Sequence, residues 1–263
     1  MKRWLAVFFV SLVPFSAALA QQNEQNALDA IKAQTQANGI NHAPFDALLK
    51  ANVDAKAGRV NYAGFVGNAD FTAYLATIAA TDPASLPSDQ ARLAFWINAY
   101  NALTISGVLK NWPGITSVST VYPDFAFFKR KDYTVGGKQY ALNDIENEVI
   151  RPTFKDPRVH AALNCASVSC PPLAAHAFSA DKIDAQLTEV MTAFANDTMR
   201  NPIKPGAVQL SQIFNWYKDD FASAGGPAKF LAPMITDAAR RDALLQAGSI
   251  GFVDYDWNLN KTP

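Results

Sequence analysis

Apolar residues recur at helical spacing over much of the first half of the chain. This periodicity predicts helices over residues 23–38, 44–56 and 65–81. The clearest pattern begins after Ser88, a favoured N-cap residue, and ends at the Trp-Pro-Gly sequence at 112–114, so we expect one helix of about 24 residues between them. Because this helix is apolar on almost every side, it is expected to lie in the centre of the protein.

The second half of the chain alternates short strand patterns with helical ones. Gly136 and Gly137 between alternating segments predict a β-hairpin, and Asn143 is expected to cap a short helix over 144–151. The remaining predictions are a buried strand at 158–164, a helix over 181–197, a strand at 207–214, a short aromatic helix at 215–221, further helices to 247 and a closing strand at 251–259. Helices around a small, mostly antiparallel sheet indicate an α+β fold, a single domain built on the central buried helix.

The N-terminus indicates export. The first twenty residues carry Lys2 and Arg3, then an apolar run, then small residues ending at Ala20, which is the pattern of a secretory signal peptide. We therefore expect a periplasmic or secreted protein formed by residues 21–263. Removing two of the 23 basic residues leaves 21 against 23 acidic ones, and this small charge gives no field for nucleic acid. No later apolar run reaches the roughly 20 residues needed to span a bilayer.

Four motifs occur in a fixed order: FWINAYNALTI at 95–105, LNDIENEVIRP at 142–152, DPRVHAALNCASVSCPPL at 156–173 and FNWYKDDF at 214–221. Together they resemble the family called domain of unknown function 547, with exported bacterial members, over about 60–225. The resemblance implies one domain built around the first motif and the His-to-Cys segment, and it implies no activity. Many members carry a histidine where this chain has Asn147, so no mechanism that needs that imidazole is expected here.

The third motif contains both cysteines of the chain and supports a thiol enzyme. In an extended HAALN segment His160 and Asn164 share a face, and Cys165 follows where the strand ends. Cys165 would be the nucleophile, His160 its base, Glu146 the group that orients the imidazole, and Asn98 a polar support. The expected activity is thiol-dependent hydrolysis or acyl transfer on a peptide or amide substrate, with no cofactor indicated.

Two alternatives compete for the same residues. Export to an oxidising compartment favours a Cys165–Cys170 disulfide, and the protein would then be a non-catalytic binding or interaction module for an unknown small-molecule or peptide ligand. His160, the two cysteines and His176 are also four zinc-compatible ligands, but their spacing is not that of a known zinc finger, so no metal site is predicted.

Polar residues elsewhere also allow two interpretations. Asn98 and Asn101 stand three apart in the apolar helix and either line a cleft or clamp the backbone of the 158–164 segment; we favour the clamp. Trp216 and Tyr217 beside three charged residues are either a sugar or peptide platform or, as is more common, a core plug with its carboxylates in water.

Overall fold

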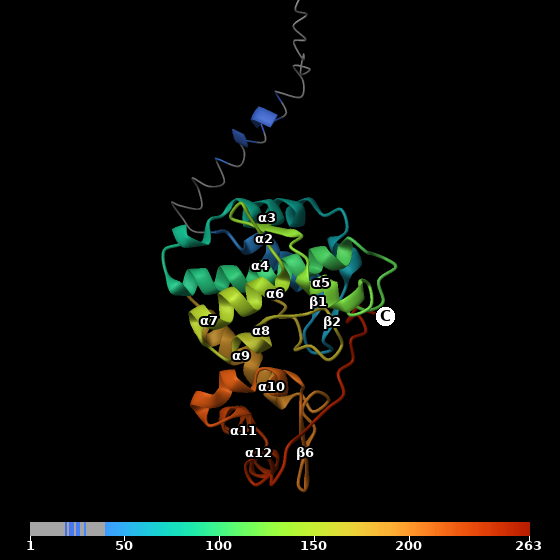
Figure 1. The fold of residues 1–263 in the computed structure, drawn as a ribbon, viewed down its shortest axis with the longest axis vertical. Helices are drawn as coiled ribbons and strands as arrows, with labels where there is room; N and C mark the ends of the chain where they lie inside the picture. Colours follow the sequence, from blue (N-terminus) through green and yellow to red (C-terminus); the bar gives the residue numbers. More distant parts are fainter. Residues whose placement is uncertain (1–18, 20, 24, 27–28, 30–39) are drawn as a thin grey trace, which may run out of the picture.

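Helix α4 (Asp89–Leu109) runs through the middle of the protein, as its apolar character predicts (Figure 1). Ser88 caps it by accepting a hydrogen bond from the backbone N–H of Ala91, at 3.1 Å. Nearly every residue between Leu93 and Val108 is buried, so the helix has no solvent face along this length. The hydrophobic core is therefore built around α4.

A computed structural model describes residues 19, 21–23, 25–26, 29 and 40–263. Most of the predicted signal peptide and most of the predicted helix over 23–38 lie outside the described residues. Within the described part of the chain, no helix combines the length and the apolar composition that crossing a membrane requires.

Helices account for most of the regular structure. Besides α4 the α-helices are α2 (Ala43–Asn52), α3 (Ala69–Ala80), α5 (Ala126–Lys129), α6 (Leu142–Asp144), α7 (Arg151–Phe154), α8 (Val159–Ala162), α9 (Ile183–Asn196), α10 (Ile213–Trp216), α11 (Pro227–Leu231) and α12 (Ala238–Leu245). Short 3-10 segments are η1 (Tyr62–Phe65), η2 (Pro83–Ser85), η3 (Pro123–Phe125), η5 (Lys218–Ala224) and η6 (Ala232–Met234), and η4 (Ile145–Ile150) is π-helical. The predicted cap at Asn143 is displaced, because the helix already begins at Leu142 and Asp144 accepts a hydrogen bond from the Ala141 N–H.

The strands are short and form small sheets. The antiparallel pairs are β1 (Val53–Asp54) with β2 (Arg59–Val60), β3 (Tyr133–Val135) with β4 (Lys138–Tyr140), and β5 (Ile203–Lys204) with β6 (Ala207–Leu210); β7 (Gly251–Phe252) joins β6 in parallel. Gly136 and Gly137 form the predicted hairpin turn between β3 and β4 with positive φ angles of 57° and 76°. Helices around small, mostly antiparallel sheets confirm the α+β fold.

The buried apolar residues form two clusters that one helix connects. The first surrounds α4, and the second lies among the C-terminal elements drawn in orange and red in Figure 1. Helix α9 contributes Leu187 to the first cluster and Phe194 to the second. The two parts of the described chain are therefore packed on a shared element.

The predicted strand at 158–164 is wrong. The chain forms one helical turn, α8, and becomes extended only at Leu163. Asp156 and Pro157 start this turn, because their carbonyl oxygens accept hydrogen bonds from the N–H groups of Val159 and His160. A short apolar run fits a buried strand and a buried helical turn equally well, so periodicity alone could not separate them.

The predicted C-terminal strand is shorter than expected. Strand β7 ends at Phe252, and the chain then runs back along the molecule in extended form. Isolated bridges join Leu259 to Ser167 and Lys261 to Val60. The C-terminal segment is thus held against both the cysteine loop and β2.

The two asparagines of α4 clamp distant backbone, but only Asn101 clamps the segment that was predicted, because Asn98 bonds to Phe178 instead. Asn101 donates from Nδ2 to the carbonyl oxygen of Ala162 at 2.9 Å and accepts from the N–H of Asn164 at 2.9 Å. Asn98 makes the same pair of bonds to the backbone of Phe178, at 2.7 and 2.9 Å. Both side chains are buried, and each satisfies one donor and one acceptor that would otherwise lack a partner.

We expect Asn101→Ala to lower the free energy of unfolding by about 2–5 kcal/mol, because it leaves two buried backbone groups without partners at about 1–3 kcal/mol each. Asn215→Ala is the matched control, since Asn215 is exposed and its change should stay within about 0.5 kcal/mol. Urea unfolding of the three proteins measures both values. Equal stability of the two variants would contradict the clamp.

Candidate functional site

A pocket of about 300 Å³ lies where residues of both hydrophobic clusters meet. This volume is at the lower end of the range for small-molecule sites. Polar groups line one part of it, and aromatic side chains line most of the rest. Its walls are Tyr100, Phe125, Phe128, Lys129, Asn143, Glu146, His160, Leu163, Cys165, Cys170, Ile213, Trp216, Tyr217, Tyr255 and Trp257. Three of the four predicted site residues, Glu146, His160 and Cys165, are therefore in one pocket.

The loop after α8 places Cys165 in this pocket. Asn164 holds the loop, donating from Nδ2 to the carbonyl oxygen of Pro171 at 2.8 Å and accepting from the N–H of Ala166 at 3.0 Å. Ala166 has a φ of 62°, in the left-handed region that side chains disfavour. Such strain persists only where surrounding contacts enforce it, and it is common at functional sites. Cys165 is partly exposed beside this strained turn.

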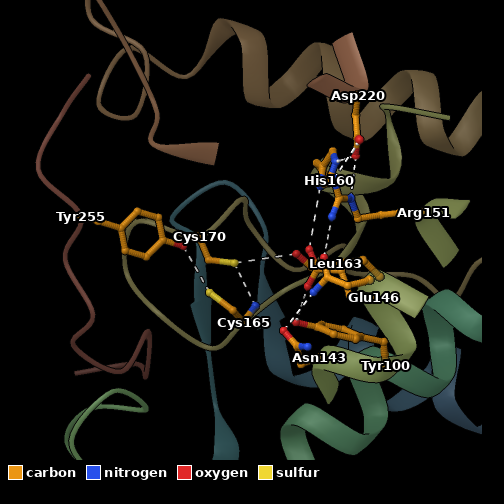
Figure 2. Close-up of polar contacts among 11 residues, drawn as sticks. Tyr100, Asn143, Glu146, Arg151, His160, Leu163, Cys165, Cys170, Asp220 and Tyr255 are labelled. Atoms are coloured by element: carbon orange, nitrogen blue, oxygen red, sulfur yellow. Dashed lines mark hydrogen bonds and ion pairs between the residues drawn. The ribbon is translucent and has the colours of Figure 1, made fainter. Parts of the chain in front are cut away.

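The predicted disulfide is wrong. Cys165 and Cys170 are both free thiols and are not at disulfide distance. The Cys170 sulfur accepts a hydrogen bond from the Cys165 backbone N–H at 2.8 Å and lies 3.7 Å from the Leu163 carbonyl oxygen. The Cys165 sulfur instead contacts the hydroxyl of Ser167 at 3.0 Å and that of Tyr255 at 3.2 Å. Figure 2 shows the contact with Tyr255. Apart from their contact with each other, the two sulfurs therefore have different partners.

The two thiols differ in acidity. Burial raises the pKa of Cys165, but hydrogen bonds from Cys170, Ser167 and Tyr255 to the thiolate outweigh this effect and bring the pKa below its ordinary value of 9.0. Burial, followed by the proximity of Cys165, raises the pKa of Cys170 well above that value. Cys165 is thus the thiol suited to nucleophilic attack, and Cys170 is a proton donor beside it.

His160 is oriented by Asp220 and not by Glu146. Its Nε2 lies 2.7 Å from Oδ2 of Asp220, whereas its Nδ1 is 3.9 Å from Oε1 of Glu146, beyond hydrogen-bonding distance. The imidazole also stacks on Tyr217, with ring centroids 4.1 Å apart. The expected approach of His160 and Glu146 is confirmed, but the contact that fixes the ring comes from a residue that the sequence did not suggest.

Asp220 is in turn held by Arg151. The guanidinium donates from Nε and Nη2 to the two carboxylate oxygens of Asp220, at 2.7 and 2.8 Å. The hydrogen bond from His160, and after it those from Arg151, hold the pKa of Asp220 well below its ordinary value against the opposing effect of burial. Asp220 therefore stays ionised and can fix the orientation of the imidazole.

Sequence reasoning missed this pair for a clear reason. The FNWYKDDF motif was expected to turn its carboxylates toward water, which suits the exposed Asp219 but not the partly buried Asp220. Arg151 lies at the end of another family motif, 69 positions before its partner. A basic residue and an acidic residue in two separate motifs were the only signal that the sequence offered.

Glu146 lies between two tyrosines. Tyr100 donates to its Oε2 at 3.3 Å. Burial, followed by the nearby Glu146 carboxylate, raises the pKa of both Tyr100 and Tyr217 well above the ordinary value. Both phenols therefore remain protonated and are available as hydrogen-bond donors next to the carboxylate.

The other candidates lie outside the pocket. Asn98 is a clamp on the Phe178 backbone and does not support the thiol. His176 lines a separate groove beside α9, so the four residues considered for zinc do not converge. Within the described residues, no group of three or more histidine, cysteine or acidic side chains is placed to hold a metal ion.

One comparison with known proteins gave a match. Residues 83–195 match the model of the family described as "Protein of unknown function, DUF547", so the resemblance carried by the sequence motifs is confirmed. This range contains Glu146, His160 and both cysteines, and it ends before Asp220 and Tyr255. No curated protein and no solved structure matches the chain.

We expect the rate of Cys165 alkylation by iodoacetamide to rise with pH with a midpoint below 9.0. Tyr255→Phe should raise the midpoint, because it removes a donor to the thiolate, and Cys170 should stay unmodified in the folded protein. Peptide mass spectrometry measures modification at each site. A midpoint at or above 9.0 for Cys165 would refute this assignment.

The lowered pKa of Asp220 predicts how stability depends on pH. Its contribution is fully present above the unfolded-state pKa, ordinarily 3.8, and is lost as pH falls through the lower folded-state pKa. The stability advantage of the wild type over Asp220→Asn should therefore shrink as pH falls below 3.8. Urea unfolding across this range tests the trend, with Asp219→Asn as the exposed control. An advantage that does not change with pH would be inconsistent with the shift.

Proposed function

We propose that this DUF547 protein is a thiol-dependent acyltransferase or hydrolase that acts on a peptide or amide substrate. Cys165 would be the nucleophile, and His160, oriented by Asp220, the general acid and base. One observation carries the proposal: a thiol of lowered pKa and an imidazole held by an ionised carboxylate line the same pocket.

Cys165 and His160 do not act as a hydrogen-bonded pair in this proposal. No hydrogen bond or ion pair joins them among the described residues, and Figure 2 shows the cysteines on one side of the site and His160 on the other. The hydrogen bonds to Cys165 lower its pKa, so its thiolate forms more readily than that of an ordinary cysteine, and the proposal does not require a direct contact with the imidazole. The imidazole is therefore free to exchange protons with the substrate nitrogen.

The reaction follows from this division. The Cys165 thiolate attacks the amide carbonyl carbon, the carbon–nitrogen bond breaks, and the nitrogen leaves with a proton from Nδ1 of His160. The resulting thioester is attacked by water or an amine, which gives a proton to Nδ1, and the thiolate is released. The hydroxyls of Ser167 and Tyr255 are close enough to Sγ to donate hydrogen bonds to the developing oxyanion.

A non-catalytic ligand-binding module is the second candidate. The observation in its favour is the absence of a direct contact between the thiol and the imidazole, combined with a pocket whose walls are mainly aromatic. This candidate predicts that the pocket binds a ligand and that Cys165 forms no acyl intermediate.

Acylation by p-nitrophenyl acetate separates the two candidates. We expect intact-protein mass spectrometry to show one acetyl group on the wild type, located on Cys165 by peptide mapping, and none on Cys165→Ala. Cys170→Ser is the control that removes the other thiol and should still acylate. His160→Ala should slow loss of the acetyl group by about 100-fold, the low end of general base catalysis.

Asp220→Asn should slow the same step less than His160→Ala does, because it removes only the group that orients the imidazole. Asp219→Asn should leave the rate unchanged. Equal acylation of the wild type and Cys165→Ala would exclude the nucleophile and favour the binding module.

A further inference from the structure

We propose that the Glu146 and His160 end of the pocket binds a protonated primary amine carried on an apolar group. This inference rests on the proposed function, in which the amine is the nitrogen that leaves the amide or attacks the thioester. Two features of the pocket support it. One is a pair of hydrogen-bond acceptors, of which the Glu146 carboxylate also lacks a charged lysine or arginine partner among the described residues, and the other is an aromatic wall.

The two acceptors face each other without being bonded. Nδ1 of His160 has no hydrogen-bond partner in the part of the chain that the structure describes, and the His160 side chain is only 1% exposed. Nε2 faces a carboxylate oxygen of Asp220, which can only accept, so Nε2 carries a proton, and Nδ1 is an acceptor once it has given its own proton to the departing nitrogen. Oε1 of Glu146 lies 3.9 Å away, and among the described residues the partners of the Glu146 carboxylate are the neutral phenols of Tyr100 and Tyr217. A ligand with several N–H groups can donate to both acceptors.

The charge around the site also favours a cation. The negative charge of Asp220 is balanced by the two hydrogen bonds from Arg151. The carboxylate of Glu146 is 13% exposed and, in the described part of the chain, has no lysine or arginine within ion-pair distance. Buried charges are normally paired, and a ligand ammonium would provide the missing partner.

The site calls for a positive charge and at least two N–H groups, one for Glu146 and one for His160. A primary ammonium supplies the charge and three N–H groups. A hydroxyl has one donor and no charge. A quaternary ammonium has the charge but no donor, and a carboxylate has neither the donors nor the correct charge.

The aromatic residues at the mouth suit an apolar carrier for this amine. Trp216 stacks on Trp257 with centroids 5.8 Å apart, and Tyr255 lies 4.4 Å from Trp257. Trp216 is 46% exposed, which is unusual for so large an apolar side chain in a pocket wall. Lys129, the only lysine or arginine among the lining residues, is exposed and donates to the carbonyl of Asp124, so water screens its charge from the Glu146 end.

The two acceptors also match the protons that an amine must lose. A primary ammonium gives up one proton before its nitrogen attacks the thioester and a second after the carbon–nitrogen bond forms. Glu146 and Nδ1 of His160 can take one each, while the carbon–sulfur bond breaks and Cys165 leaves as the thiolate. The step needs no further reactant.

The test measures binding without chemistry, using Cys165→Ala protein and the quenching of tryptophan fluorescence near neutral pH. We expect benzylamine to bind at least about 10-fold more tightly than benzyl alcohol, benzyltrimethylammonium or benzoate, as one or two charge-assisted hydrogen bonds require. Glu146→Gln in the same background should remove most of this preference. Glu148→Gln, an exposed carboxylate two residues away, should keep it.

Tighter or equal binding of benzyl alcohol or benzoate would overturn the amine subsite, and this comparison needs no variant of Glu146. Unchanged selectivity in Glu146→Gln would overturn it as well. The acylation experiment fails or succeeds separately, because the binding protein lacks the nucleophile. Selective amine binding without acylation of the wild type would leave the subsite in place and reject the enzyme. Acylation of the wild type without selective amine binding would support the enzyme and reject the subsite.

Discussion

The site depends on the pair of hydrogen bonds that Asn101 makes to the backbone at Ala162 and Asn164. A buried amide in an apolar helix must be satisfied, and here it is satisfied only if the segment after α8 lies directly against α4. That segment carries His160 at one end and Cys165 at the other. The buried central helix thus fixes, through the backbone, the segment that carries both side chains of the candidate site.

A second constraint acts between the two hydrophobic clusters. Arg151 follows η4 on the side of α4, whereas Asp220 belongs to η5 in the C-terminal part of the chain. His160 completes the chain of contacts, and its ring is stacked on Tyr217 from the C-terminal part. The orientation of the imidazole therefore depends on how the two parts are packed.

The sequence predicted those features that depend on local pattern and burial. The Ser88 cap, the glycine hairpin and the inward position of Asn98 and Asn101 follow from spacing along the chain, and the structure confirms them. The turn at α8 was not predicted, because four residues, three of them apolar, are too few to show a period. The disulfide was expected because export exposes cysteines to oxidants and because the loop between the two cysteines is short. Neither argument tells where a sulfur atom points.

The pocket is built from two sources within the chain. Its floor, with Glu146, His160 and Cys165, comes from the range that the family model covers, while Trp216 and Tyr255 at its rim come from later segments. The C-terminal third therefore supplies contact surface and also two groups that set the state of the site, since Asp220 fixes the imidazole and Tyr255 contacts the Cys165 sulfur. A substitution at Trp216 would change only the surface that a bound molecule meets, whereas one at Tyr255 would change the thiol as well.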